Sequence, residues 1–371
     1  MTKFYSLVFA SILILGLGGC QSLEQISIDY LEPGDVSFPA QFRKVAIVNN
    51  TSSESDSIFM LPLNKQKTDK EGEVASGIAY FRGESRLATE ALAEEIAKQN
   101  YFESVIICDS ALRSSDNLQR ENRLSQEEVQ ELSSDLGVDF IISLEDLQFK
   151  ATKAIHFIPE YNSFKGTVDV KAYPTVSIYL PNRSKPMTTL HLNDSIFWED
   201  YGGTAVEAIS GLISDKEVIK EASDFAGTVP VKSLVPMWKT DKRYIYTGGS
   251  VQMRDAAVYV RENSWDNAYE LWNQVYNATK KGKKKMMAAL NIAVYYEMKD
   301  SIDLAEKWAN KAQQLAMDAE KIKNIEEMEK INSYNMPEEI YLSTLYVNKL
   351  KERNSQLPKL KMQMERFNDD F

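Results

Sequence analysis

Between residues 42 and 150, short apolar runs typical of buried strands alternate with segments whose apolar residues recur at helical spacing. The expected strands are residues 44–49, 103–108 and 140–144, and the expected helices are residues 84–99 and a segment that follows Ser125. Ser125 and Glu128 have the spacing of a capping box, and Gly137 is of the residue type that commonly ends a helix. Strands that alternate with helices predict an α/β region.

A pattern of period two follows farther along the chain. Residues 167–180 and 187–200 alternate apolar and polar positions on either side of a turn-rich segment at 181–186. A sheet with one solvent-exposed face and one buried face is typical of antiparallel strands, so we expect a β-hairpin beside a mixed sheet. Residues 203–226 return to helical spacing, whereas residues 51–82 are polar and irregular and predict a long loop.

The last third of the chain has helical spacing and repeats itself. Two sets of small and aromatic residues follow the template of the tetratricopeptide repeat. The first set is Ala256, Tyr259, Ala268, Trp272 and Val275, and the second is Ile292, Ala293, Tyr296, Ala305, Ala309 and Ala312. In such repeats, small residues let the two helices of a hairpin approach closely, while an aromatic side chain fills the groove between repeats. An ordinary helical bundle with an alanine-rich seam is the alternative interpretation.

These patterns predict that an α/β domain precedes an all-α domain. The expected parts are a tether at 20–41, an α/β domain with a mixed sheet and a β-hairpin at 42–247, tetratricopeptide-like helical hairpins at 248–357, and a charged, fraying tail at 358–371. The repeats would form a groove that binds a peptide of a partner protein. The residues expected to line this groove are Tyr259, Trp272, Tyr295 and Tyr296.

The composition is that of a globular protein, with 43% hydrophobic and 26% charged residues. A formal net charge of −11 argues against nucleic acid as a partner, because phosphate binding needs clustered Lys and Arg. Two cysteines and two histidines are too few for a structural zinc site, and we expect neither a metal nor a cofactor. The basic segment 280–285 is either a solvated loop between repeats or a contact for anionic headgroups or an acidic partner.

The N-terminus has the layout of a secretory signal. A short basic segment, residues 1–3, precedes an apolar stretch at 4–17 that is too short to span a bilayer. The sequence Leu-Gly-Gly-Cys at 17–20 resembles the bacterial lipobox. This resemblance implies a lipoprotein signal peptide at 1–19 and fatty acyl chains, such as palmitate, on Cys20; a plain signal peptide is the alternative. Because neither an Asp nor a dense acidic run follows Cys20, lipoprotein sorting rules imply the outer membrane, on its periplasm-facing side.

Further resemblances concern the rest of the chain. The strand–helix order that ends in the Leu-Gly-Val-Asp turn at 136–139 is similar to the α/β domain of the TolB N-terminal, curli-secretion and peptidoglycan-synthase-activator lipoproteins. Segments 25–33, 44–50 and 234–246 resemble an uncharacterised family of Bacteroidota-type lipoproteins that end in tetratricopeptide repeats. Ser57, in an Asp-Ser-Ile triplet, resembles the O-glycosylation site of Bacteroidota envelope proteins.

No familiar catalytic motif occurs in the sequence, neither a phosphate-binding loop, nor a nucleophile elbow, nor His-Glu-x-x-His. Cys108 lies in an apolar run and is expected to be an inert thiol, since a nucleophile would need His156 or His191 as its base. Both histidines are expected to be structural. Glu199 and Asp200 are expected to be solvated rather than an acid–base pair.

An anchor and repeats without a catalytic constellation favour a non-enzymatic, membrane-anchored scaffold or adaptor that binds proteins in the cell envelope. One alternative is a self-assembling secretion or envelope-assembly component that resembles the curli-secretion lipoproteins, in which the chain forms a homo-oligomer. The other alternative is an envelope hydrolase whose carboxylates lie far apart in sequence.

Overall fold

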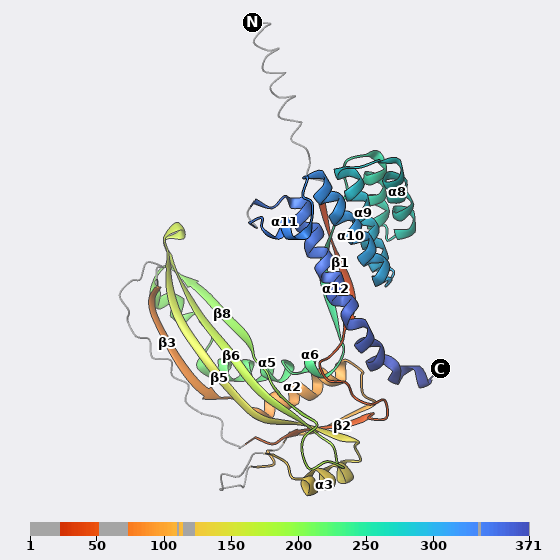
Figure 1. Cartoon of the computed structure of the whole chain (residues 1–371). Helices are drawn as coiled ribbons and strands as arrows, with labels where there is room; N and C mark the ends of the chain where they lie inside the picture. Colours follow the sequence, from red (N-terminus) through yellow and green to blue (C-terminus); the bar gives the residue numbers. More distant parts are fainter. Residues whose placement is uncertain (1–22, 52–72, 110, 114–122, 333–334, 371) are drawn as a thin grey trace. The chain divides into compact units, whose positions relative to one another are not determined.

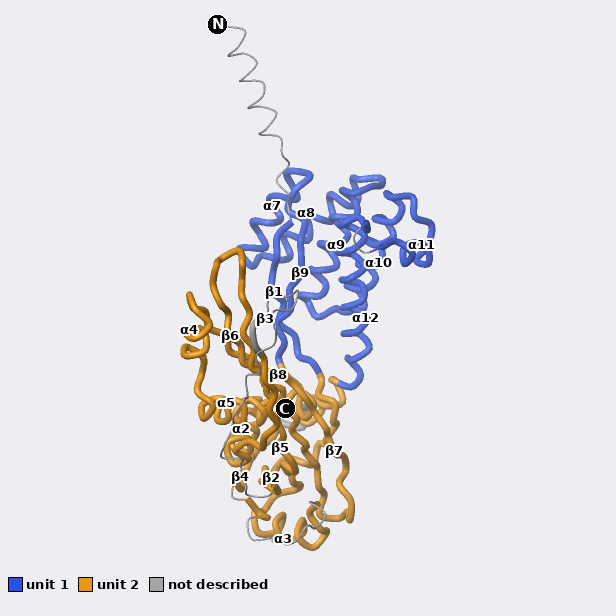
Figure 2. The backbone as a smooth tube through the Cα atoms, turned by 90° about the vertical axis from the view of Figure 1, so that its left-hand side faces the viewer, with its two compact units in different colours: residues 1–32, 238–359 blue, residues 33–237, 360–371 orange. Residues whose placement is uncertain are grey.

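The structure is a computed structural model that describes residues 23–51, 73–109, 111–113, 123–332 and 335–370. The chain divides into two compact units, which are described separately (Figure 2). The α/β unit comprises Pro33–Met237 and Leu360–Phe371, and the helical unit comprises Trp238–Lys359 and the residues up to Glu32. Cys20 and Ser57, the predicted modification sites, lie outside the described residues.

The α/β unit is built on a mixed sheet (Figure 1). Its strands are β2 (Lys44–Asn49), β3 (Glu73–Arg82), β4 (Ser104–Cys108), β5 (Phe140–Ile158), β6 (Ser163–Tyr179), β7 (Thr188–His191) and β8 (Asp194–Gly202). Strand β2 pairs in parallel with β4 on one side and with β5 on the other. Strand β5 also pairs antiparallel with β3 and with β6. Strand β6 in turn pairs antiparallel with β7 and β8. The predicted α/β region with a mixed sheet is therefore confirmed.

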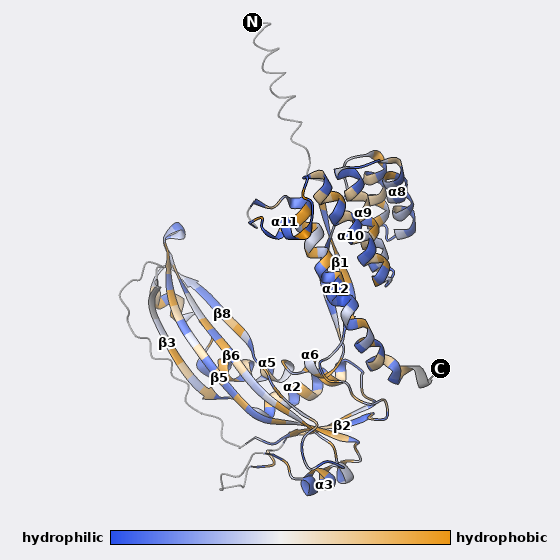
Figure 3. Cartoon of the chain, viewed as in Figure 1, coloured by the Kyte–Doolittle hydropathy of each residue, from blue (hydrophilic) through white to orange (hydrophobic). Residues whose placement is uncertain are grey.

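Helices pack against both faces of this sheet, because alternate residues of β2 are buried in two separate cores. They are α2 (Ser85–Lys98), α3 (Gln126–Leu136), α4 (Ala205–Ser210), α5 (Asp215–Thr228) and α6 (Val231–Leu234), and a 3-10 turn, η1 (Pro159–Tyr161), joins β5 to β6. Alternate residues of the long strands, such as Phe149 and Val170, are buried with Leu92 of α2 and Ala222 of α5 in one core. Figure 3 shows the resulting alternation of apolar and polar residues along these strands.

The local signals of the second helix are confirmed. Ser125 accepts a hydrogen bond from the backbone of Glu128, whose side chain accepts one from the backbone of Ser125. Gly137 ends the helix in the left-handed region at φ 64°. The predicted hairpin is only part of the antiparallel sheet: β6 pairs along its whole length with β5, which extends far beyond residue 144. Residues 73–82, expected in a loop, form β3 on the edge of β5.

The helical unit contains helices that follow one another in the chain. They are α7 (Val251–Arg261), α8 (Trp265–Ala278), α9 (Lys283–Met298), α10 (Ile302–Ala319), α11 (Ile325–Glu329) and α12 (Glu338–Met364), whose residues from Leu360 on belong to the α/β unit. The alanines at the predicted close approaches are buried: Ala256, Ala268, Ala293 and Ala305. A C-terminal region of several helices is confirmed.

The predicted tether at 20–41 is wrong for residues 23–32. These residues form strand β1 (Leu23–Glu32), which pairs with β9 (Met237–Tyr246) in a two-stranded sheet. Ile28 and Tyr30 are buried in the core of the helical unit together with Ile245. The alternation of Ile26, Ile28 and Tyr30 with polar residues is the period of a half-buried strand, but its partner lies more than 200 residues away along the chain.

The predicted fraying of the tail at 358–371 is also wrong. Helix α12 continues to Met364, and a 3-10 turn, η3 (Glu365–Asp370), follows. The side-chain amide of Gln363 donates hydrogen bonds to the backbone oxygens of Gly34 and Val36, at 2.9 and 2.8 Å. The guanidinium of Arg366 donates to the backbone oxygen of Tyr101 and lies 4.0 Å from the centroid of its ring. Polar side chains that bond buried backbone groups hold this segment in place.

We expect a chain that ends after Leu357 to lose about 2–4 kcal/mol of unfolding free energy in the α/β unit, because the buried hydrogen bonds of Gln363 and Arg366 disappear. Denaturant unfolding of the full chain and the truncated chain measures the difference. A chain that ends after Phe367 keeps both side chains and is the control. Equal unfolding midpoints for all three chains would contradict the prediction.

Candidate functional site

The four aromatic residues expected to line a peptide groove are not brought together. Trp272 of α8 is 0% exposed, so the prediction that it lines a groove is wrong. Its ring fills the core of the helical unit beside Trp265, with centroids 6.4 Å apart. Tyr259 is half-buried on α7, and only Tyr295 and Tyr296, which are neighbours on α9, touch each other.

Tyr295 and Tyr296 form a cluster with Tyr269 of α8. The rings of Tyr269 and Tyr295 stack with centroids 4.4 Å apart, and the hydroxyls of Tyr269 and Tyr296 are 3.3 Å apart. The Tyr295 hydroxyl donates to Asp266 at 2.8 Å. Burial and this carboxylate raise the pKa of Tyr295 to about 12. Since each of these hydroxyls already has a partner, the cluster packs α8 against α9 rather than presenting open polar groups.

An apolar pocket lies elsewhere in the helical unit, where β9, α9 and α12 meet. We call it the apolar socket; it is lined by Lys242, Arg243, Tyr244, Leu290, Val294, Leu342, Leu345, Tyr346 and Lys349. Its volume of about 70 Å³ is roughly that of two water molecules, which is room for one small branched side chain. Leu345 and Tyr244 are 42% and 38% exposed, so apolar surface is open to solvent here.

A buried charge cluster supports one wall of the apolar socket. Glu297 of α9 is fully buried and accepts two hydrogen bonds of 2.8 Å from Arg243 of β9. Arg353 and Tyr346 of α12 donate to the same carboxylate at 3.0 and 2.8 Å. Burial and Glu297 raise the pKa of Tyr346 well above its ordinary value. The cluster therefore joins β9, α9 and α12 and fixes Arg243 and Tyr346, which line the socket.

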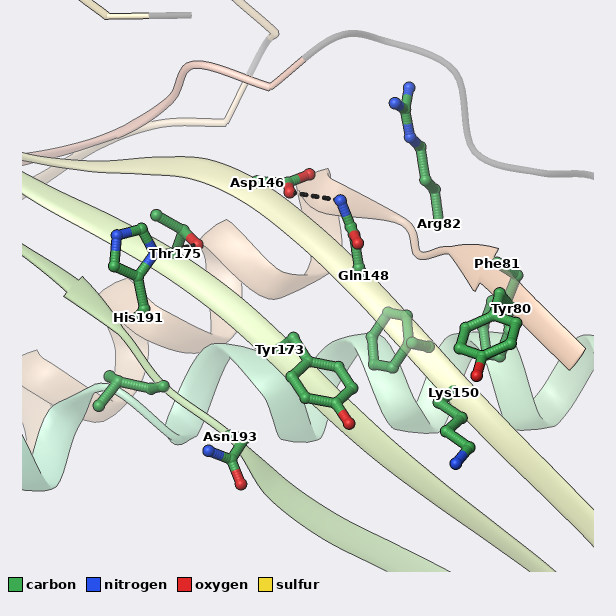
Figure 4. A pocket seen from close by; sticks show the side chains of 12 residues that line it. Tyr80, Phe81, Arg82, Asp146, Gln148, Lys150, Tyr173, Thr175, His191 and Asn193 are labelled. Atoms are coloured by element: carbon green, nitrogen blue, oxygen red, sulfur yellow. Dashed lines mark hydrogen bonds between the residues drawn. The ribbon is translucent and has the colours of Figure 1, made fainter.

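A wider pocket lies on the face of the antiparallel sheet in the α/β unit (Figure 4). We call it the sheet-face pocket; its volume is about 750 Å³, and it is lined by Tyr80, Phe81, Arg82, Asp146, Gln148, Phe149, Lys150, Tyr173, Thr175, His191, Leu192 and Asn193. Because side chains alternate along a strand, Gln148 and Lys150 point away from the buried core that holds Phe149. A hydrogen bond of 2.7 Å from Gln148 to Asp146 orders part of the floor.

The titratable groups named from the sequence do not form a catalytic arrangement among the described residues. His191 lines the sheet-face pocket, while His156 lies on β5 and is not among its lining residues. Cys108 is half-buried on β4, where burial raises the pKa of its thiol. Lys165 hydrogen-bonds Glu199 and lowers the pKa of that carboxyl. Glu199 is therefore the charged partner of an ion pair rather than a general acid.

Sequence reasoning missed a buried polar cluster at the carboxyl ends of the parallel strands. Glu145 accepts hydrogen bonds from Asn50 at 2.7 Å and from Tyr179 at 2.9 Å. Burial raises the pKa of Glu145, and these two hydrogen bonds oppose the shift. Arg113 donates to Asn50 at 2.9 Å and also pairs with Glu128 of α3. Each member has a protein partner, so the cluster connects β2, β5, β6 and α3.

Two family models match the chain. One, described as a domain of unknown function (DUF8603), matches residues 42–246. The other, also described as a domain of unknown function (DUF6340), matches residues 254–352. Neither the curated proteins nor the solved structures include a match.

Two features are absent from the part of the chain that the structure describes. None of its helices is both long and apolar enough to cross a membrane. No group of three or more His, Cys, Asp or Glu residues within it has the arrangement to hold a metal ion.

Proposed function

Since the first family model covers more than half of its residues, the chain belongs to the family described as domain of unknown function DUF8603, and we propose that it is a membrane-anchored scaffold of the cell envelope. In this proposal, acyl chains on Cys20 hold it at the periplasm-facing side of the outer membrane. The helical unit binds segments of partner proteins. The chain acts as an adaptor rather than as an enzyme.

The anchor rests on the sequence of residues 1–20. Burial of each acyl CH₂ contributes roughly 0.8 kcal/mol, so one chain binds a membrane only marginally, whereas the two or three chains of a bacterial lipoprotein bind it durably. A protein fixed in this way meets its partners at the membrane surface. The Bacteroidota-type lipoproteins that the chain resembles would share this location.

We also propose that α7 to α10 are two repeats of the tetratricopeptide type. The small residues of the template are buried where consecutive helices pack, and the helix boundaries fall between the two halves of each template. Repeats of this kind stack into an extended surface that binds peptides or helices of other proteins. Helix α12 would cap the stack.

The apolar socket is the observation that carries the proposal. An exposed apolar site with room for one side chain is the usual anchor point of a protein–protein interface, where few residues supply most of the binding energy. Lys242 is exposed among its lining residues and would contact an acidic residue next to the anchoring side chain, whereas Lys349 already pairs with Asp241 at 2.6 Å. Leu345 provides the exposed apolar wall.

We expect Leu345→Asp to reduce capture of the partner at least about tenfold, because a carboxylate in the socket would have to be desolvated on binding. Quantitative co-purification from cross-linked cells compares this variant with the native chain. The matched control is Leu304→Asp on α10, since Leu304 is 41% exposed and does not line the socket. If both variants capture the same proteins in the same amounts, the socket is not the binding site.

A further inference from the structure

Two lysines lie opposite each other on the antiparallel sheet of the α/β unit. Lys150 of β5 and Lys171 of β6 are direct partners in the strand register. Neither makes an ion pair with any residue that the structure describes. Like charges directly opposite each other destabilise a sheet. A bound anion at this point would relieve the repulsion between the two ammonium groups.

Two exposed tyrosines flank this lysine pair. Tyr80 of β3 is the register partner of Lys150 and is 74% exposed. Tyr173 of β6 is 37% exposed, and the ammonium of Lys171 lies 5.5 Å from the centroid of its ring. Both tyrosines line the sheet-face pocket (Figure 4). Their ring faces carry negative partial charge and attract the weakly positive C–H groups of a sugar ring that stacks on them.

The remaining polar lining of the sheet-face pocket suits hydroxyl groups. Asn193 offers both donors and an acceptor of hydrogen bonds. Gln148 donates to the Asp146 carboxylate at 2.7 Å, and the Thr175 hydroxyl lies 3.2 Å from Nδ1 of His191, so these side chains offer their remaining donors and acceptors. A volume of about 750 Å³ lies within the range of about 300–1,000 Å³ that is typical of ligand pockets. Such a site has room for several sugar units.

We propose that the sheet-face pocket binds an oligosaccharide that carries acidic groups. The acidic groups contact Lys150, which lines the pocket, and its register partner Lys171, which is not among the lining residues. The sugar rings stack on Tyr80 and Tyr173. An acidic peptide would also be attracted by the lysines, so the test includes one. The two exposed tyrosine rings and the polar lining favour a sugar, because a sugar ring stacks on an aromatic face. The inference is independent of the scaffold function, which concerns the helical unit.

Titration calorimetry of the full chain tests the inference. The probe is hexagalacturonic acid, the neutral probe is cellohexaose, and the acidic peptide is hexaglutamate. A printed array of acidic and neutral oligosaccharides extends the search to other acidic sugars. The variants are Tyr173→Ala, Tyr80→Ala and Lys150→Gln. The matched control is Tyr201→Ala, because the ammonium of Lys165 lies 5.6 Å from the Tyr201 ring, in a similar pair outside the pocket.

We expect the acidic hexasaccharide or an acidic sugar of the array to bind, and binding to weaken with added salt. Each tyrosine variant is expected to weaken binding about tenfold, and Lys150→Gln to weaken it similarly for acidic sugars only. Tyr201→Ala is expected to change it less than about twofold. Equal affinity for neutral sugars, equal binding of hexaglutamate with no effect of the tyrosine variants, or no binding of any acidic sugar would each overturn the proposal.

Discussion

Replacing Glu297 by alanine is expected to lower the free energy of unfolding of the helical unit by about 3–5 kcal/mol, which is typical when one partner of a buried ion pair is removed. The carboxylate is fully buried and is shared by Arg243 and Arg353. Without it, two guanidinium groups stay in the interior and lose this counter-charge. Strand β9 and helix α12 would lose their common attachment to α9.

Denaturant unfolding of the full chain measures this effect, with circular dichroism at a helix-sensitive wavelength as the signal. Glu326→Ala is the matched control, because Glu326 is an exposed carboxylate on helix α11 of the same unit. Its replacement is expected to change the unfolding free energy by no more than about 0.5 kcal/mol. If the two variants unfold at the same denaturant concentration, the Glu297 cluster does not hold the helices together.

Replacing Cys20 by serine is expected to move the protein from the membrane fraction to the soluble fraction. The variant has no thiol to accept acyl chains. Loss of two or three acyl chains removes tens of buried CH₂ groups at roughly 0.8 kcal/mol each. Cell fractionation followed by mass spectrometry of the N-terminal peptide measures both the location and the modification.

Cys108→Ser is the matched control for this experiment. Cys108 is half-buried on β4, and its replacement leaves the N-terminal segment unchanged. We expect this control to stay in the membrane fraction with a lipid-modified N-terminus. A Cys20→Ser chain that remained in the membrane fraction after a high-salt wash would contradict the lipid anchor.

The parts of the fold that depend on neighbouring residues could be predicted from the sequence. Ser125, Glu128 and Gly137 act within one helix, so the pattern and the structure agree. The continuation of β5 beyond residue 144 was missed because small residues such as Ala151 and Ala154 fill its buried positions and reduce the apolar contrast. Strand β1 was missed because its partner β9 lies in a distant part of the chain.

The candidate sites were harder to predict because they depend on which segments meet. Trp272 matched a repeat position, but spacing alone does not distinguish a core aromatic from one that lines a groove. Glu297 directly follows Tyr295 and Tyr296 on α9, and only the approach of β9 and α12 explains its burial. Lys150 and Lys171 are unremarkable along the chain and become a pair only through the register of β5 and β6.

The most direct test of the proposed scaffold function is a photo-reactive amino acid placed at position 345 of the full chain in living cells. Leu345 is an exposed wall of the apolar socket, and the same amino acid at position 304, at similar exposure, is the reference. We expect light to link a defined partner protein to position 345 and not to position 304. The same cross-links from both positions, or none from position 345, would contradict it.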